Sequence, residues 1–218
     1  MKPQPINRFA AQSLLHIPGF INRPIRERSV GEIVSAIQTA VKNTGYEEVA
    51  LLSLSSSDYS YINELIETLQ AKFKDRNLSI SLPSLRIDSF SIDLMEKLRG
   101  KRSGGFTLAP EAASDHMREE INKPISEEAL LDTVKAIFER GWSTIKLYFM
   151  IGQPFETEED VLKIADLCNK TMRVGKDIIG GRAKVNVSVS TLIPKPHTPF
   201  QWATMNTPDD ISEKHHII

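Results

Sequence analysis

The sequence predicts an α/β fold with parallel strands, and three observations support this. From Ser29 onward, short apolar runs alternate with longer segments whose apolar residues recur with the helical period. Strands that alternate with helices pair in parallel through right-handed crossovers. No glycine-rich phosphate loop follows the first run, and polar residues follow all five runs. Barrel enzymes build their sites at the carboxyl ends of the strands. Periodicity alone does not separate a barrel from an open doubly wound sheet, but the last two observations favour a barrel, with about five parallel strands.

The expected elements follow from these patterns. Strands are predicted at residues 48–54, 78–82, 105–109, 144–151 and 185–191. Helices are predicted up to Gly45 and at about residues 58–74, 92–98, 126–140 and 157–174. Asp58 and Ser126 are residue types that cap helix N-termini, and Gly45 is a natural stop.

The composition is typical of a globular protein. The chain has 218 residues, which is ample for a core, and a formal net charge of −1. This charge gives no global basic field that would favour nucleic acid. The apolar runs are far shorter than the roughly 20 residues of a membrane span. Because the first residues do not resemble a secretory signal, we expect a cytoplasmic protein with no membrane partner.

Cys168 is the only cysteine. A single thiol cannot form an intramolecular disulfide, nor can it alone hold a zinc ion or an iron–sulfur cluster. Cys168 continues an apolar helical stripe that includes Val161 and Ile164. We therefore predict a small core residue rather than a nucleophile.

Polar residues with chemical potential follow the first three strands. Ser55, Ser56 and Ser57 are suited to bind an amino or carboxylate group, although a polar capping loop explains them equally well. Arg86 follows the second strand and could clamp a carboxylate or pair with a nearby acid. Glu111 follows the third strand between small residues, which favours a role in taking hydroxyl or ammonium donors.

The last two strands end in further candidates. Gly152 permits the close approach of a flat ligand, which Met150 or Ile151 would flank. A proline-rich loop after the fifth strand carries Lys195 and His197. Its stiffness favours placement of an acid–base or substrate-contacting histidine over a loop that only covers the barrel mouth.

Six stretches taken together resemble one family, an uncharacterised family of radical S-adenosylmethionine enzymes. Its core is related to tRNA methylthiotransferases and cobalamin-dependent radical enzymes. The stretches are residues 22–29, 51–59, 81–88, 105–112, 145–152 and 187–202. The resemblance predicts a core domain over residues 19–203, an unmatched segment 1–18 and a tail 204–218.

The resemblance also implies cofactors and roles. The fold would be a partial (β/α)₆ barrel of the radical S-adenosylmethionine type without its first strand. A 4Fe–4S cluster would reduce S-adenosylmethionine to a 5′-deoxyadenosyl radical that acts on an unknown substrate, by family analogy an RNA or a protein. The implied cofactor contacts are Ser55, Ser56 and Ser57 for the amino group, Arg86 and Glu111 for the carboxylate or ribose, and Met150, Ile151 and Gly152 for adenine. Lys195 and His197 would lie toward the substrate.

The cluster-binding motif of the family, CxxxCxxC, is missing. Its positions before Gly19 are occupied by Phe9, Ser13 and His16. We therefore expect no bound cluster and no radical chemistry from this form of the chain. The abrupt start of the resemblance suggests a replaced segment or a reading-frame error, with a truncated end after about Glu213.

Two other functions stay open. The chain could be a non-catalytic domain that binds S-adenosylmethionine or a partner. Alternatively, it could be a conventional barrel enzyme that uses Glu111 and His197 as an acid–base pair.

Without its first strand, the sheet would have an open edge, along which we expect association with another chain.

Overall fold

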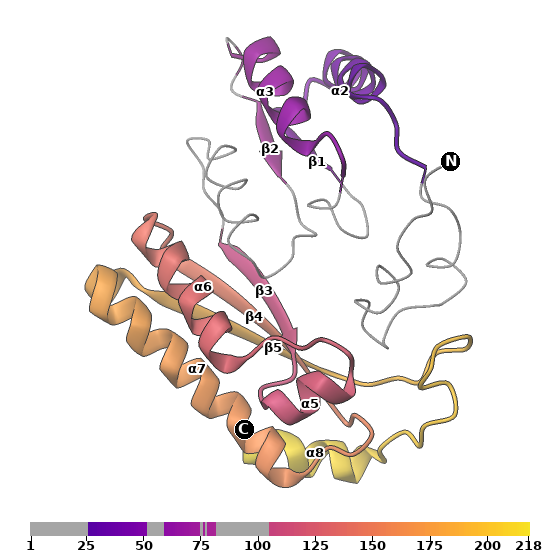
Figure 1. Ribbon diagram of the computed structural model, residues 1–218, viewed down its shortest axis with the longest axis vertical. Helices are drawn as coiled ribbons and strands as arrows, with labels where there is room; N and C mark the ends of the chain where they lie inside the picture. Colours follow the sequence, from indigo (N-terminus) through magenta and orange to yellow (C-terminus); the bar gives the residue numbers. More distant parts are fainter. Residues whose placement is uncertain (1–25, 52–58, 75, 77, 82–104) are drawn as a thin grey trace. The chain divides into compact units, whose positions relative to one another are not determined.

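The computed structural model describes residues 26–51, 59–74, 76, 78–81 and 105–218. These residues fall in two compact units, one within Ile25–Gly105 and one from Phe106 to the C-terminus (Figure 1). The predicted cap Asp58 and the predicted helix 92–98 lie outside the described residues.

The unit within Ile25–Gly105 is a pair of helices packed on a pair of strands. Helix α2, Val30–Thr44, begins at a capping box formed by Ser29 and Glu32 and ends at Gly45, whose φ is 71°. Helix α3 spans Ile62–Lys72. Strand β1, Glu48–Ala50, pairs in parallel with β2, Ser79–Ser81. The apolar faces of both helices form the core, which includes Val34, Ile37, Val41, Leu65, Ile66 and Leu69.

The second unit holds a parallel sheet in the order β3-β4-β5. Its strands are β3, Phe106–Glu111, β4, Thr144–Ile151, and β5, Lys184–Thr191. The register of β4 and β5 runs without interruption from Thr144 beside Lys184 to Ile151 beside Thr191. Alternate residues of β4 are buried, among them Leu147 and Phe149, as expected for a strand with one face covered.

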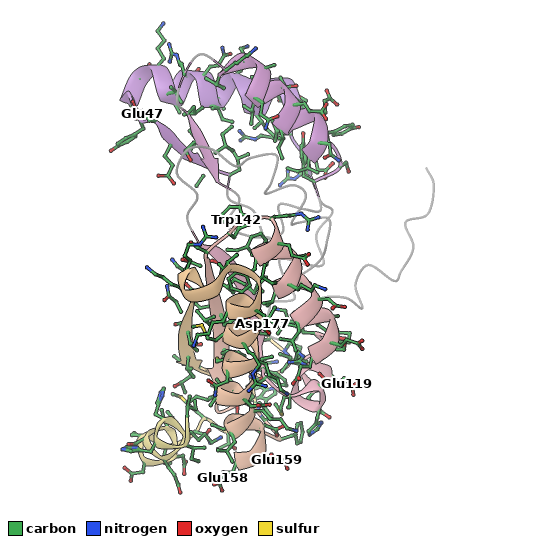
Figure 2. The ribbon with its side chains drawn as sticks, turned by 90° about the vertical axis from the view of Figure 1, so that its left-hand side faces the viewer. Glu47, Glu119, Trp142, Glu158, Glu159 and Asp177 are labelled. Carbon is green, nitrogen blue, oxygen red and sulfur yellow. The ribbon has the colours of Figure 1, made fainter. Side chains whose placement is uncertain are left out.

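Helices α6, Glu127–Glu139, and α7, Glu158–Ile179, run along this sheet (Figure 1). The short helix α5, Asp115–Glu120, follows β3, and α8, Pro208–Ile217, contacts α7. Figure 2 shows Glu158 and Glu159 at the amino end of α7. None of the described helices combines the length and apolarity of a membrane span.

The predicted α/β class with parallel strands is confirmed, since all five described strands pair in parallel. The predicted strand 144–151 agrees with β4 to the residue. Helix α7 continues beyond the predicted end at about residue 174 to Ile179, with Gly175 inside it. A Cβ on Gly175 would lie 2.7 Å from the Phe138 ring, so this glycine permits close packing of α7 on α6 instead of ending the helix.

Two helices of this unit were not predicted. Helix α5 has only six residues, too few to show a period. Helix α8 has no buried residue, so it lacks the apolar stripe that sequence patterns reveal. It begins nonetheless with a complete capping box, Thr207 and Asp210, around Pro208.

Candidate functional site

The carboxyl end of β3 presents Glu111 in an unusual backbone conformation. Its φ is 67°, and the pairing with β4 shifts register between Leu108 and Glu111. A left-handed conformation in a residue other than glycine costs about 1–3 kcal/mol, and such residues cluster at functional sites. Because this strained backbone stands at the carboxyl end of a strand in a parallel sheet, we treat Glu111 as a candidate functional residue.

Lys123 is the partner of this carboxylate. Its Nζ lies 3.5 Å from Glu111 Oε1, and both side chains are about three-quarters buried, with 26% and 24% exposed. The same Nζ donates to the carbonyl oxygen of Ala109. Burial lowers the pKa of Lys123, while the neighbouring Glu111 opposes this shift. The pair therefore places a positive and a negative group together at the strand end.

Arg118 holds the loop that follows Glu111. Its side chain is fully buried, and Nη1 donates to the carbonyl oxygens of Ala112 at 3.0 Å and Ala113 at 2.9 Å. Further bonds reach the carbonyl of Ile125 and the carboxylate of Asp115. A guanidinium that satisfies several carbonyls in a rigid fork fixes the backbone just beyond the strand.

Asp160 joins this loop to the one after β4. Its Oδ1 accepts from Ser114 Oγ at 2.5 Å, and its Oδ2 accepts from Thr157 Oγ1 at 2.7 Å. Ser114 caps α5, and Thr157 caps α7. Burial raises the pKa of Asp160, but the hydrogen bonds from Ser114 and Thr157 outweigh it, so the pKa lies below the ordinary value.

The turn after β4 is built around Gly152, whose φ is 78°. The Gly152 N–H donates to Glu156 Oε1 at 2.9 Å, and Lys214 Nζ on α8 lies 2.5 Å from the same oxygen. The Glu156 side chain is only 4% exposed. Asn206 lies against the glycine, since a Cβ there would come within 2.7 Å of Asn206 Oδ1. A glycine is thus needed here for the close approach of Asn206, whose side chain occupies the space where a Cβ would lie.

Gln153 bridges the ends of β3 and β4. Its Nε2 donates to the carbonyl oxygens of Glu111 at 3.1 Å and Met150 at 2.8 Å. The residue is 5% exposed, and its Oε1 is buried without a hydrogen-bond partner. The amide therefore ties the two strand ends together and leaves one acceptor unused.

The loop after β5 presents Lys195 and His197 with exposed side chains. The backbone N–H of His197, whose φ is 61°, donates to Gln201 Oε1 at 3.2 Å, and Thr198 Oγ1 donates to the Lys195 carbonyl at 2.7 Å. Thr198 is buried. These bonds fix the turn and leave both candidate side chains facing solvent.

The structure thus describes only part of the predicted site. Glu111 and Met150 are bridged by Gln153, and Gly152 adjoins the buried Ile151. The described contacts do not bring Lys195 or His197 into this group. The remaining predicted residues lie outside the described part of the chain: Phe9, Ser13, His16, Ser55, Ser56, Ser57 and Arg86.

Several residues at these strand ends were not predicted from the sequence: Lys123, Gln153, Glu156, Asn206 and Lys214. Lys123 comes from a loop beyond α5, and Asn206 and Lys214 come from a segment with no apolar period. Of these residues only Glu156 stands in a recognisable pattern, because acids are common at the start of a helix.

Cys168 lies on α7, half-buried. Burial raises the pKa of its thiol to about 11, which leaves it unreactive at neutral pH. Its neighbour Leu167 is fully buried and faces the core more directly.

Within the described residues, there is no group of three or more His, Cys, Asp or Glu side chains that could hold a metal ion.

Comparison with known proteins places this arrangement in a family. The chain is 39% identical over 178 residues to an uncharacterized protein of Methanocaldococcus jannaschii, a match that covers 82% of the chain and 37% of that protein. The chain thus spans little more than a third of the length of this relative.

A solved structure, coproporphyrinogen III oxidase (HemN) from Escherichia coli, described as a radical SAM enzyme, matches with a TM-score of 0.56 at 13% identity. The match covers 88% of the chain and 46% of the HemN chain, and at this identity it shows the fold alone. The family model of the radical SAM superfamily matches residues 15–168, more than half of the chain. This protein belongs to the radical SAM superfamily and has its parallel α/β fold.

Proposed function

We propose that the carboxyl ends of β3 and β4 bind S-adenosylmethionine. In the superfamily, this cofactor supplies a 5′-deoxyadenosyl radical after reductive cleavage. The membership of the chain in that superfamily supports the proposal. The observation that carries it is the group of polar side chains around the bridging amide of Gln153, at the edge where α/β barrels build their sites.

The residues present fit such a ligand. S-adenosylmethionine carries a carboxylate, an amino group, ribose hydroxyls and a purine. Glu111 offers a carboxylate for hydroxyl or ammonium donors, and its partner Lys123 offers a positive charge for a carboxylate. Met150 is partly buried and remains a proposed contact of the purine, whereas Ile151 is fully buried and the Asn206 side chain lies against Gly152. The buried Gln153 Oε1 still lacks a donor. Ser55, Ser56, Ser57 and Arg86 remain proposed contacts.

The 4Fe–4S cluster does not fit the residues of this chain. The superfamily motif requires three cysteines, and the sequence has only Cys168. That thiol is half-buried within a helix, and burial raises its pKa. Phe9 and Ser13 stand at two of the motif positions, where they cannot replace thiolates. We therefore propose that this stretch binds S-adenosylmethionine but does not itself cleave it.

Calorimetric titration tests the binding. We expect saturable heat with S-adenosylmethionine and about threefold to tenfold weaker binding for Glu111→Gln, because one charge-assisted hydrogen bond would be lost. Glu119→Gln makes the same change on the exposed face of α5 and should leave the affinity unchanged (Figure 2). No heat at millimolar ligand would refute the proposed binding.

Anaerobic reconstitution with iron and sulfide tests the second part. We expect no stoichiometric cluster absorption in the visible range, because the cysteine ligands are absent. A chain that retains a cluster after desalting would contradict the proposed lack of cleavage while leaving the binding proposal intact.

The acid–base pair Glu111 and His197 receives less support. The described partner of the Glu111 carboxylate is Lys123, and the His197 side chain is exposed. The substrate of the longer relatives, by family analogy an RNA or a protein, remains a separate proposal. Capture of radiolabelled total RNA by the chain, without capture of a matched single-stranded DNA, would favour RNA, and lack of capture would leave protein.

A further inference from the structure

One face of the sheet β3-β4-β5 is exposed and polar. Helices α6 and α7 run along the sheet (Figure 1), and every second residue of β4 is buried, whereas Lys146 and Tyr148 between them are exposed. Their register partners on β5, Asn186 and Ser188, are exposed as well. Side chains at paired positions of neighbouring strands lie on the same face of a sheet. These four residues, with Lys184 and Ser190 at alternate positions of β5, therefore form one surface, which we call the open face.

The chemistry of the open face differs from that of a packed core. Where a barrel interior serves only for packing, bulky branched apolar residues dominate it. On β4 and β5, this face instead carries two ammonium groups, a phenol, an amide and hydroxyls, and none of its side chains is acidic. The chain as a whole has a net charge of −1. The open face is thus locally positive in a chain without an overall basic field, which favours an anionic ligand there.

Lys146 and Lys184 are the charged groups of the open face. Five other lysines of the same unit lie at most 3.9 Å from a carboxylate oxygen: Lys123, Lys135, Lys163, Lys170 and Lys214. Neither Lys146 nor Lys184 has such a partner within the described part of the chain. Because Lys184 pairs with Thr144, a strand spacing of about 4.8 Å and a rise of about 3.3 Å per residue put the two lysine Cα atoms about 8 Å apart. Two long, flexible side chains span this distance, so both ammonium groups reach a single anion.

Tyr148 supplies a flat surface beside the lysines. It is 42% exposed, although it lies in the middle strand of the sheet. Its register partner on β5 is Ser188, whose small side chain covers little of the ring. An exposed ring of this kind stacks against planar groups. On β4 and β5, Tyr148 is the single aromatic residue of the open face, so we expect one planar group rather than a series of stacked bases.

We propose that the open face binds a small molecule that carries a phosphate group on a planar body, with the phosphate at Lys146 and Lys184 and the planar part on Tyr148. Lysine binds phosphate as a point charge, whereas a carboxylate is matched best by the planar fork of arginine, which this face lacks. The role of this ligand as the substrate rests on the proposed function, because the open face leads from the lysines to the strand ends proposed for the cofactor.

Binding of 1-naphthyl phosphate in the absence of S-adenosylmethionine tests the site, with uncharged 1-naphthol as the matched ligand. We expect saturable binding of the phosphate and at least about tenfold weaker binding of the naphthol. Lys146→Gln or Lys184→Gln should weaken the phosphate about tenfold and leave the naphthol unchanged, because one charge-assisted hydrogen bond is lost. Tyr148→Ala should weaken both ligands about fivefold or more, and Tyr148→Phe, which keeps the ring, should weaken neither.

Lys176→Gln is the matched control. Lys176 is exposed on α7, and its substitution removes the same charge away from the open face. It should leave the affinity for 1-naphthyl phosphate as in the wild type. Equal weakening by Lys176→Gln and Lys146→Gln would show attraction to the overall charge of the chain and would overturn the proposal.

Further ligands make the chemical class testable. If 1-naphthoate binds as tightly as 1-naphthyl phosphate, the assignment of a phosphate is wrong. If a single-stranded RNA hexamer binds more tightly than the small ester and loses affinity in the same variants, the occupant is a nucleic acid and not a small molecule. Lack of saturable binding of 1-naphthyl phosphate at millimolar concentration would overturn the site, whatever the titration with S-adenosylmethionine shows. Failure of that titration alone would leave the phosphate site standing.

Discussion

Asp160 connects two strand-end loops through one carboxylate, and this gives a residue-scale prediction. Its folded pKa is lowered, so the ionised group stabilises the fold above the ordinary carboxyl range of about 4. That stabilisation is lost as the pH falls through the folded pKa. We expect Asp160→Asn to lower the free energy of unfolding by about 1–3 kcal/mol at neutral pH. Urea titrations from pH 7 to pH 3 should show a smaller loss of stability for the variant. The exposed Asp132→Asn should match the wild type, and a parallel pH dependence for both variants would count against the role of Asp160.

At the scale of elements, helix α7 shows how packing can override a sequence signal. The sequence predicts the end of this helix at about residue 174, just before a glycine, yet α7 continues to Ile179, and Gly175 lets Phe138 and Ala183 approach. We expect Gly175→Ala to lower the free energy of unfolding by about 1–2 kcal/mol, since the overpacking cost exceeds the gain in helix propensity of up to about 1 kcal/mol. Gly31→Ala, with open space around its Cβ position in α2, should be neutral or stabilising. Equal effects of the two substitutions in chemical denaturation would show that the contact with Phe138 can relax.

The same scale explains what the sequence could and could not predict. The apolar periods predict the strands and the long helices. They also place Glu111 at the carboxyl end of β3, where barrel enzymes build their sites. The partners of these residues follow from no local pattern. Glu156 and Lys214 are 58 residues apart in the chain, and Lys214 lies on a helix with no buried residue. Contacts of this kind depend on how loops return to the sheet, which apolar periodicity does not encode.

At the scale of the whole molecule, the outer edge of β5 is the surface along which we expect self-association. Among the described strands, β5 pairs only with β4, and Val187 at this edge is 43% exposed. An eight-residue edge strand that pairs on one side only, among the described strands, is a template for another chain. The near-zero net charge of −1 supplies little repulsion against association. We expect sedimentation velocity to show a concentration-dependent dimer, and Val187→Lys to shift the chain toward monomer, because a charged side chain on an edge strand opposes pairing. Asp177→Lys, a charge change on the exposed side of α7, should not have this effect. A wild-type chain that remains monomeric at all concentrations would show that this edge is already protected.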